Sequence, residues 1–188
     1  MPKFMSRPVA VLSAVAFGAL ALSATVVAPV RAQEKTVMVG GAAMFPSKNI
    51  IQNAVHSKDH TTLVAAVKAA GLVDTLEGKG PFTVFAPTNT AFGKLPTGTV
   101  DNLIKPENKA TLTKILTYHV VPGKLEASDL ADGKKLRTVE GEELTVKKAD
   151  GKVMIVDAKG GAATVTVPNV NQSNGVIHVV DTVLMPAS

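Results

Sequence analysis

Two of the four histidines stand close enough in the sequence to suggest a shared ligand. His56 and His60 are four residues apart, a spacing that on one helix would place both imidazoles on the same face, and Met44 lies nearby. Imidazole and thioether groups bind copper or zinc. Asp59, however, is a residue type that commonly begins a helix. We therefore expect the pair to straddle a helix start, and we predict no metal site and no cofactor.

The residues that could act as nucleophiles do not occur in catalytic patterns. The chain has no cysteine, which excludes thiol nucleophiles and cysteine-bound zinc. It contains no H-E-x-x-H, P-loop or G-x-G-x-x-G pattern. The serines that follow residue 32 are Ser47, Ser57, Ser128, Ser173 and Ser188, and none of them lies in a G-x-S-x-G motif. We predict a protein that is not an enzyme.

Several polar residues stand inside apolar stretches, where structural roles are expected. His178 shares a strand face with Val176 and Val180, which favours a buried histidine with hydrogen-bond partners. Asp181 points the other way, and its carboxylate is expected to accept backbone or side-chain hydrogen bonds. Asn89 is expected to cap the helix that follows it.

These side chains need a scaffold, and residues 80–92 indicate its central strand. Phe82 and Val84 would lie on one face of that strand and Phe85 on the other, so both faces carry apolar bulk. A short run of this kind, preceded by a turn, is typical of a buried strand. Pro87 should end it, because proline has no N–H to donate to a neighbouring strand.

The remaining sequence changes from helical to strand-like patterns along the chain. Apolar residues between Asp59 and Gly71 follow helical spacing, with Gly71 as the expected stop. Another helix should begin at Pro106. From residue 136 onward, Val- and Thr-rich stretches alternate with turns, and Asp150-Gly151 is typical of a hairpin. Helices followed by antiparallel strands predict an α+β domain without a series of parallel crossovers.

The N-terminal stretch predicts export. Lys3 and Arg7 precede an uncharged, apolar run over residues 8–30, and Val30-Arg31-Ala32 fits a cleavage site. We therefore expect a signal peptide at 1–32, a linker-like lead-in at 33–48 and one domain at 49–186. An uncleaved membrane anchor is the alternative for the first segment. After cleavage we expect no membrane association and a secreted or periplasmic location.

The charge of the mature chain excludes one class of partner. Without residues 1–32, seventeen basic side chains face fifteen acidic ones, a net charge of +2. No basic stripe interleaved with aromatic residues remains, so we do not expect nucleic-acid binding.

Three stretches resemble the fasciclin domain. Residues 83–92 resemble its first box, Tyr118-His119 its Tyr-His element, and residues 174–184 its closing box, in the order of a single domain. The resemblance implies a wedge of small β-sheets with helices packed along one edge, and an extracytoplasmic role in cell adhesion or matrix contact. Animal members carry several domains and an acidic-Ile tetrapeptide near the closing box. This chain has one domain and no such tetrapeptide, as expected of a small bacterial form, so integrin binding is not carried over.

The resemblance also marks Tyr118 and His119 as a candidate interaction element, with Phe85, Pro87, Asn89, His178 and Asp181 as structural positions. The alternative is that Tyr118 faces the core and His119 satisfies a buried polar group, which we favour.

Two functions follow as hypotheses. The first is an exported, non-enzymatic module that binds a surface or matrix partner, either a protein or a glycan. The second is a periplasmic binder of a small apolar ligand between the sheets and the helices. A deep apolar pocket with polar groups would favour the second, and an exposed patch over a tight core would favour the first.

Overall fold

The computed structural model describes residues 35–187, so the expected signal peptide at 1–32 lies outside the described residues. Its helices are α1 (Ile50–Ala54), α2 (Thr61–Ala70), α3 (Val73–Glu77), α4 (Asn89–Gly93), α5 (Thr99–Leu103) and α6 (Lys109–Tyr118), with 3-10 turns η1 (Lys58–His60) and η2 (Pro106–Asn108). Its strands are β1 (Val37–Val39), β2 (Ala42–Met44), β3 (Phe82–Pro87), β4 (Val120–Pro122), β5 (Lys135–Arg137), β6 (Glu143–Ala149), β7 (Lys152–Val156), β8 (Ala162–Gln172) and β9 (Gly175–Val180).

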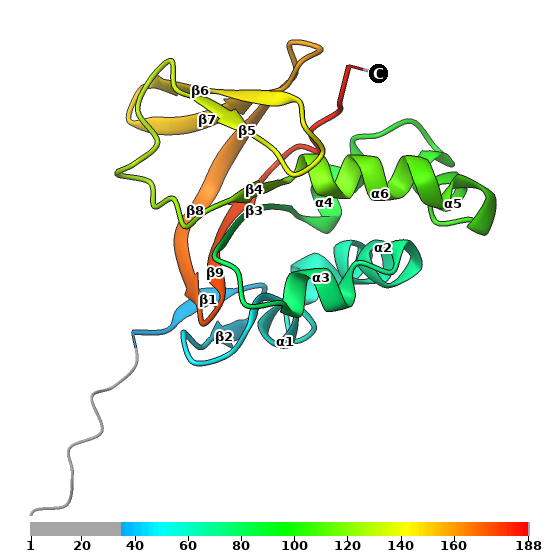
Figure 1. Cartoon of the computed structure of the whole chain (residues 1–188), viewed down its shortest axis with the longest axis horizontal. Helices are drawn as coiled ribbons and strands as arrows, with labels where there is room; N and C mark the ends of the chain where they lie inside the picture. The colour runs from blue at the N-terminus through cyan, green and yellow to red at the C-terminus, as the bar shows by residue number, and fades with distance from the viewer. Residues whose placement is uncertain (1–34, 188) are drawn as a thin grey trace, which may run out of the picture. The chain divides into compact units, whose positions relative to one another are not determined.

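Seven of these strands form one ladder in the order β4-β3-β9-β8-β7-β6-β5. All neighbours in it are antiparallel except β3 and β9, which run parallel with Phe85 opposite His178. The mixture of helices and mainly antiparallel strands confirms the α+β prediction (Figure 1). The sequence did not indicate the parallel pair, because the two strands lie far apart along the chain.

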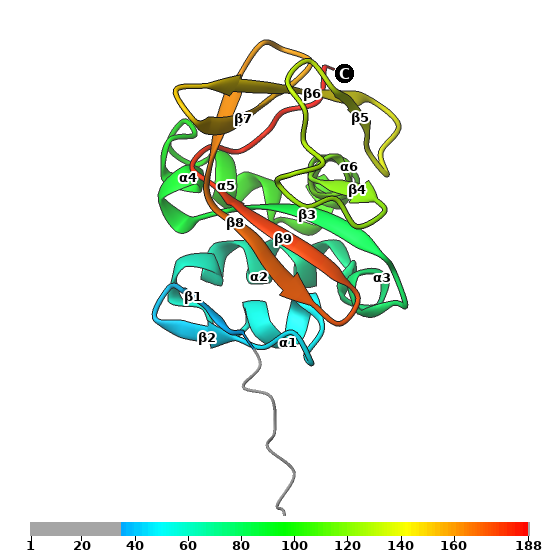
Figure 2. The ribbon, with the colours of Figure 1, turned by 90° about the vertical axis from the view of Figure 1, so that its left-hand side faces the viewer.

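Strand β3 lies inside the ladder, between β4 and β9, and is buried on both faces, as its residue pattern predicts. Its alternate side chains enter two different cores: Val84 and Ala86 face one, and Phe85 faces the other. The first, here called the helical core, joins β3 and β9 to helices α1–α4 and α6 and to the β1–β2 hairpin. The second, the sheet core, lies between β3–β9 and the outer strands β5–β8 (Figure 2).

The β1–β2 hairpin corrects the expectation of a linker-like lead-in at 33–48. Residues 37–39 pair with 42–44 across a Gly40-Gly41 turn, and both glycines have positive φ. Val39 and Met44 are buried and belong to the helical core. With three residues each, these strands are too short for alternation to reveal them, and only packing against the domain gives them a buried face.

The helix ends follow local rules in part. Gly71 ends α2 with φ +74°, and the Leu72 N–H donates to the Val67 carbonyl at 3.0 Å, the expected Schellman stop. The start of α2 is different from the prediction: Asp59 lies inside η1, and no side chain of the preceding residue caps α2.

The β6–β7 turn confirms the hairpin prediction. Ala149 pairs with Lys152, which leaves Asp150 and Gly151 as a two-residue loop with φ of 51° and 73°. Positive φ at both positions is the type I′ pattern that aspartate and glycine tolerate best.

Candidate functional site

Tyr118 ends α6 with its side chain in the sheet core. No part of the residue is exposed to solvent. Its hydroxyl accepts a hydrogen bond from the Ala158 N–H at 2.9 Å and lies 3.4 Å from the Glu143 carbonyl. Burial raises the pKa of this hydroxyl, and nearby carboxylates led by Asp157 add to the shift. Tyr118 therefore ties the end of α6 to the loop after β7.

His119 is 2% exposed and uses both ring nitrogens. Nδ1 lies 2.8 Å from the Ile115 carbonyl, to which it must donate, and Nε2 accepts from the Leu184 N–H at 2.9 Å. This pairing requires the neutral ring with its proton on Nδ1. Burial lowers the pKa of His119 to about 4, although the Ile115 carbonyl opposes the shift. His119 thus connects α6 to the segment after β9.

The candidate interaction element therefore lies in the interior and not on a face. In this conformation neither Tyr118 nor His119 is available to a partner. Their hydrogen bonds support the scaffold alternative rather than the contact role that the resemblance implies.

His178 and Phe85 pack together at the centre of the molecule. Their rings stack with centroids 5.7 Å apart and planes inclined by 25°. His178 Nε2 lies 2.8 Å from the Leu125 carbonyl, and Nδ1 accepts from the Asn169 N–H at 3.3 Å. Burial lowers the pKa of His178, and the Leu125 carbonyl partly opposes the shift. The histidine holds the 124–127 loop against β9.

Asp181 and Pro87 mark the ends of the paired central strands. Pro87 is the last residue of β3 and lies opposite Val180. The Asp181 carboxylate accepts from the Thr164 N–H at 2.8 Å and from the Thr182 hydroxyl at 3.0 Å, and it lies 3.7 Å from the Lys94 ammonium. Partial burial raises the pKa of Asp181, but these partners outweigh it and hold the pKa below its usual value.

Asn89 does not cap the helix that follows it. Thr88 caps α4 instead, accepting from the Ala91 N–H. The Asn89 side chain reaches back, where its Oδ1 accepts from the Thr62 N–H at 3.0 Å and its Nδ2 donates to the Lys58 carbonyl at 2.8 Å. It therefore satisfies the start of α2, a helix that lacks a cap from its own sequence.

Buried amides do comparable work at positions that the sequence analysis did not single out. Asn174 accepts from the Ile50 N–H at 3.1 Å and donates to the Leu76 and Gly78 carbonyls at 2.6 and 2.9 Å. It thereby joins the β8–β9 turn to the start of α1 and the end of α3. The signal available was the Asn174-Gly175 turn pair, which predicts a turn but not these partners.

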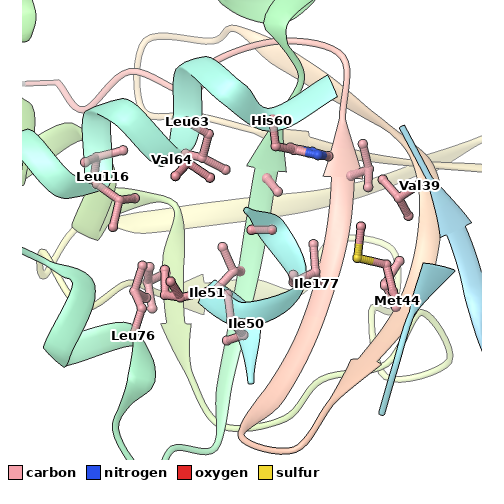
Figure 3. Close-up of a pocket in the computed structure, with 17 residues that line it drawn as sticks. Val39, Met44, Ile50, Ile51, His60, Leu63, Val64, Leu76, Leu116 and Ile177 are labelled. Carbon is pink, nitrogen blue, oxygen red and sulfur yellow. The ribbon is translucent and has the colours of Figure 1, made fainter. Parts of the chain in front are cut away.

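A hollow lies inside the helical core, between β3–β9 and the helices (Figure 3). Of the seventeen residues that line it, His60 alone has a polar side chain. His60 lies in η1 and is 3% exposed, whereas His56 is exposed. The two histidines thus do not share a helix face. Within residues 35–187 no three histidine or acidic side chains gather in a way that could hold a metal.

The opposite side of the outer strands presents a solvated surface, here called the outer face. Strand pairing places its members on one side, while the alternate residues Leu144, Val146 and Ile155 enter the sheet core. The outer face carries four cations, one carboxylate, and half-buried threonine and apolar side chains: Lys135, Arg137, Lys147, Lys152, Glu143, Thr145, Met154 and Val156. Lys135 pairs with Glu143 at 3.2 Å, leaving three cations on this face in excess.

Comparison with known proteins gives the family. Residues 58–186 match the model of the Fasciclin domain. The chain belongs to the fasciclin-domain family. The three sequence boxes all fall within the matched segment, so the resemblance drawn from them is confirmed.

This fasciclin domain has bacterial relatives. Protein sll1483 of Synechocystis sp. is 48% identical over 168 residues, which cover 89% of this chain and 90% of the relative. Immunogenic protein MPB70 of Mycobacterium bovis is 38% identical over 138 residues, 71% of this chain and 66% of that protein. Cell surface glycolipoprotein MPB83 of Mycobacterium bovis is 44% identical over 115 residues, 61% of this chain and 48% of that protein.

A solved structure shows the same fold. The FAS1 domain pair from the insect cell adhesion molecule Fasciclin I superposes with a TM-score of 0.66 at 20% identity, over 75% of this chain and 52% of that one. In the part of the chain that the structure describes, no helix has the length and apolar character needed to cross a bilayer.

Proposed function

We propose that this fasciclin domain is an exported, non-enzymatic module that binds a cell-surface or matrix partner through its outer face. The partner is a protein or a glycan, and the location is secreted or periplasmic. Family membership and a relative named as a cell surface glycolipoprotein support the extracytoplasmic role. The uncharged leader over residues 8–30 supports it independently.

The outer face carries this proposal because it combines accessibility with the chemistry that recognition needs. Lys147 and Lys152 are exposed, and Met154 and Val156 lie half-buried beside them on the same side of the sheet. Cations bind carboxylates and sulfates and speed the approach of anionic partners. Apolar side chains between them supply contact area. A partner with acidic groups spaced along an apolar or sugar surface fits this arrangement.

Charge reversal on the outer face tests the proposal. Lys147→Glu combined with Lys152→Glu should weaken binding to intact cells or isolated matrix about tenfold or more, and wild-type binding should weaken as salt rises. The matched control is Lys68→Glu combined with Lys105→Glu, which changes the net charge equally at two exposed positions outside the outer face, one in α2 and one between α5 and η2. Control binding should stay near that of wild type.

Two results would overturn the proposal. If both double variants lose binding equally, net charge and not the outer face drives association. If neither loses binding while wild type binds, the contact surface lies elsewhere.

A further inference from the structure

The hollow in the helical core is small and almost wholly apolar. Side chains from the hairpin, from helices α1, α2, α3 and α6 and from the strands line it, among them Met44, Ile51, Leu63 and Ile177. Its volume is about 40 Å³. Sites that enclose drug-sized ligands have volumes of about 300–1,000 Å³, so this one suits only a small molecule.

His60 gives the hollow one polar atom that has no partner. Its Nδ1 lies 2.9 Å from the Ser57 hydroxyl, whereas its Nε2 is buried without a hydrogen bond. Figure 3 shows the ring reaching among the side chains that line the space. Burial lowers the pKa of His60; the Ala86 carbonyl is near enough to oppose the shift but makes no hydrogen bond with Nε2. The ring is therefore neutral at neutral pH.

An unpaired buried nitrogen is costly, and it calls for an occupant. A single water would have few partners, because a buried water needs two to four of them and His60 carries the only polar side chain among the lining residues. An apolar molecule with one polar group matches the lining better. A hydroxyl suits either state of the ring, since it can donate to Nε2 if Nδ1 carries the proton and accept from Nε2 if it does not.

We propose that this cavity binds a small apolar molecule carrying one hydroxyl, with its hydrocarbon part among the aliphatic side chains and its oxygen paired with Nε2 of His60. The site is separate from the outer face, because the sheet core lies between that face and β3–β9. Ligand binding here therefore goes beyond the proposed surface function and does not depend on it.

The experiment is an NMR titration of the exported protein with 1-butanol and n-pentane, which differ by a hydroxyl in place of a methyl. Both should shift the methyl signals of Leu63 and Ile177 in a saturable way, 1-butanol with a dissociation constant on the order of millimolar. Only 1-butanol should move the ¹⁵N resonance of His60 Nε2, because only it forms the hydrogen bond.

Variants separate the polar contact from the cavity itself. His60→Leu should weaken 1-butanol binding about tenfold and leave n-pentane binding equal or stronger, since the hydroxyl would then be buried unpaired. His56→Leu, four residues earlier and exposed, is the matched control and should bind both as wild type does. If His60→Leu does not fold, the wild-type ¹⁵N titration decides alone.

Three results would overturn the proposal. Methyl signals that do not saturate with either probe would mean that the cavity takes no ligand. A His60 ¹⁵N resonance unmoved at saturating 1-butanol would remove its role as the polar contact. A bound water that persists at Nε2 through the titration would show that water occupies the site.

Discussion

The two cores on either side of β3 and β9 differ in how fully they are packed and in how fully their buried polar groups are hydrogen-bonded. On the side of the sheet core, the Tyr118 hydroxyl and both ring nitrogens of His178 have hydrogen-bond partners, and the Phe85 ring stacks on the His178 imidazole. In the helical core, space remains and His60 keeps one nitrogen unpaired. Both cores share the same two strands. The difference therefore arises from what packs against them: continuous strands on one side and short helices with a hairpin on the other.

Three buried histidines sharpen the contrast. His119 and His178 each bond two backbone groups, which fixes the tautomer of the ring and joins distant segments. His60 bonds one side chain three residues away. A histidine with two hydrogen-bond partners stabilises the fold, whereas a histidine with an unpaired nitrogen at a cavity can still form a hydrogen bond with a ligand. Burial alone does not distinguish them, because all three are almost fully enclosed.

The largest expected effect comes from equal truncations in the two cores. Leu144→Ala in the sheet core should lower the free energy of unfolding by about 4–5 kcal/mol, because the truncation leaves a new cavity among tightly packed neighbours. Leu63→Ala, which lines the existing hollow, should cost only about 2–3 kcal/mol. Urea denaturation of both variants measures the difference. Equal losses would mean that the two cores are packed alike.

Variants of Tyr118 test whether the Tyr-His element stabilises the sheet core or forms a binding surface. Tyr118→Ala should destabilise the domain by about 3–5 kcal/mol, and Tyr118→Phe by about 1–3 kcal/mol because the Ala158 N–H loses its acceptor. Thermal melting and a cell- or matrix-binding assay on both variants decide between the roles. A Tyr118→Ala protein of full stability that no longer binds would make this residue part of the working site.

Acid should weaken the domain through its buried histidines. The pKa of His119 falls from 6.5 to about 4 on folding, so between those values the unfolded chain binds a proton that the folded chain does not. Stability should therefore be full above pH 6.5 and fall by about 3 kcal/mol as the pH drops toward 4, with His60 and His178 acting in the same direction.

The measurement is the free energy of unfolding from pH 7.5 to pH 4.5, compared between wild type and His119→Gln. The variant should be less stable at pH 7.5 but show a shallower decline. An identical decline in both proteins would assign the pH dependence to other groups.

The smallest expected effects have opposite signs in the two cores. Ala86→Val, on the β3 face that lines the hollow, should stabilise the domain by about 0.5–1 kcal/mol by filling space. Ala163→Val, fully buried in the sheet core, should destabilise it by about 1–3 kcal/mol through overpacking. Melting temperatures of the two variants provide the readout. A loss of stability in both would show that the hollow cannot accept a further methyl pair.

Features set by neighbouring residues were predictable from the sequence. The two-faced strand at Phe82–Pro87, the Gly71 helix stop and the Asp150-Gly151 hairpin each depend on side-chain alternation or on backbone angles that a few adjacent residues control. The three boxes identified the family for the same reason, since each is a local run of residues.

Features that need a distant partner were decided by the tertiary structure. From its neighbours in the sequence Asn89 is expected to cap its own helix, yet its Oδ1 accepts a hydrogen bond from the Thr62 N–H of another helix. The sequence shows that Tyr118-His119 follows a helix, but only packing shows that both residues are enclosed. The hollow beside His60 is a still more collective property, because seventeen residues from separate elements must each stop short of filling it. Sequence patterns determine which face of an element is apolar, whereas the space left between such faces depends on how all of them meet.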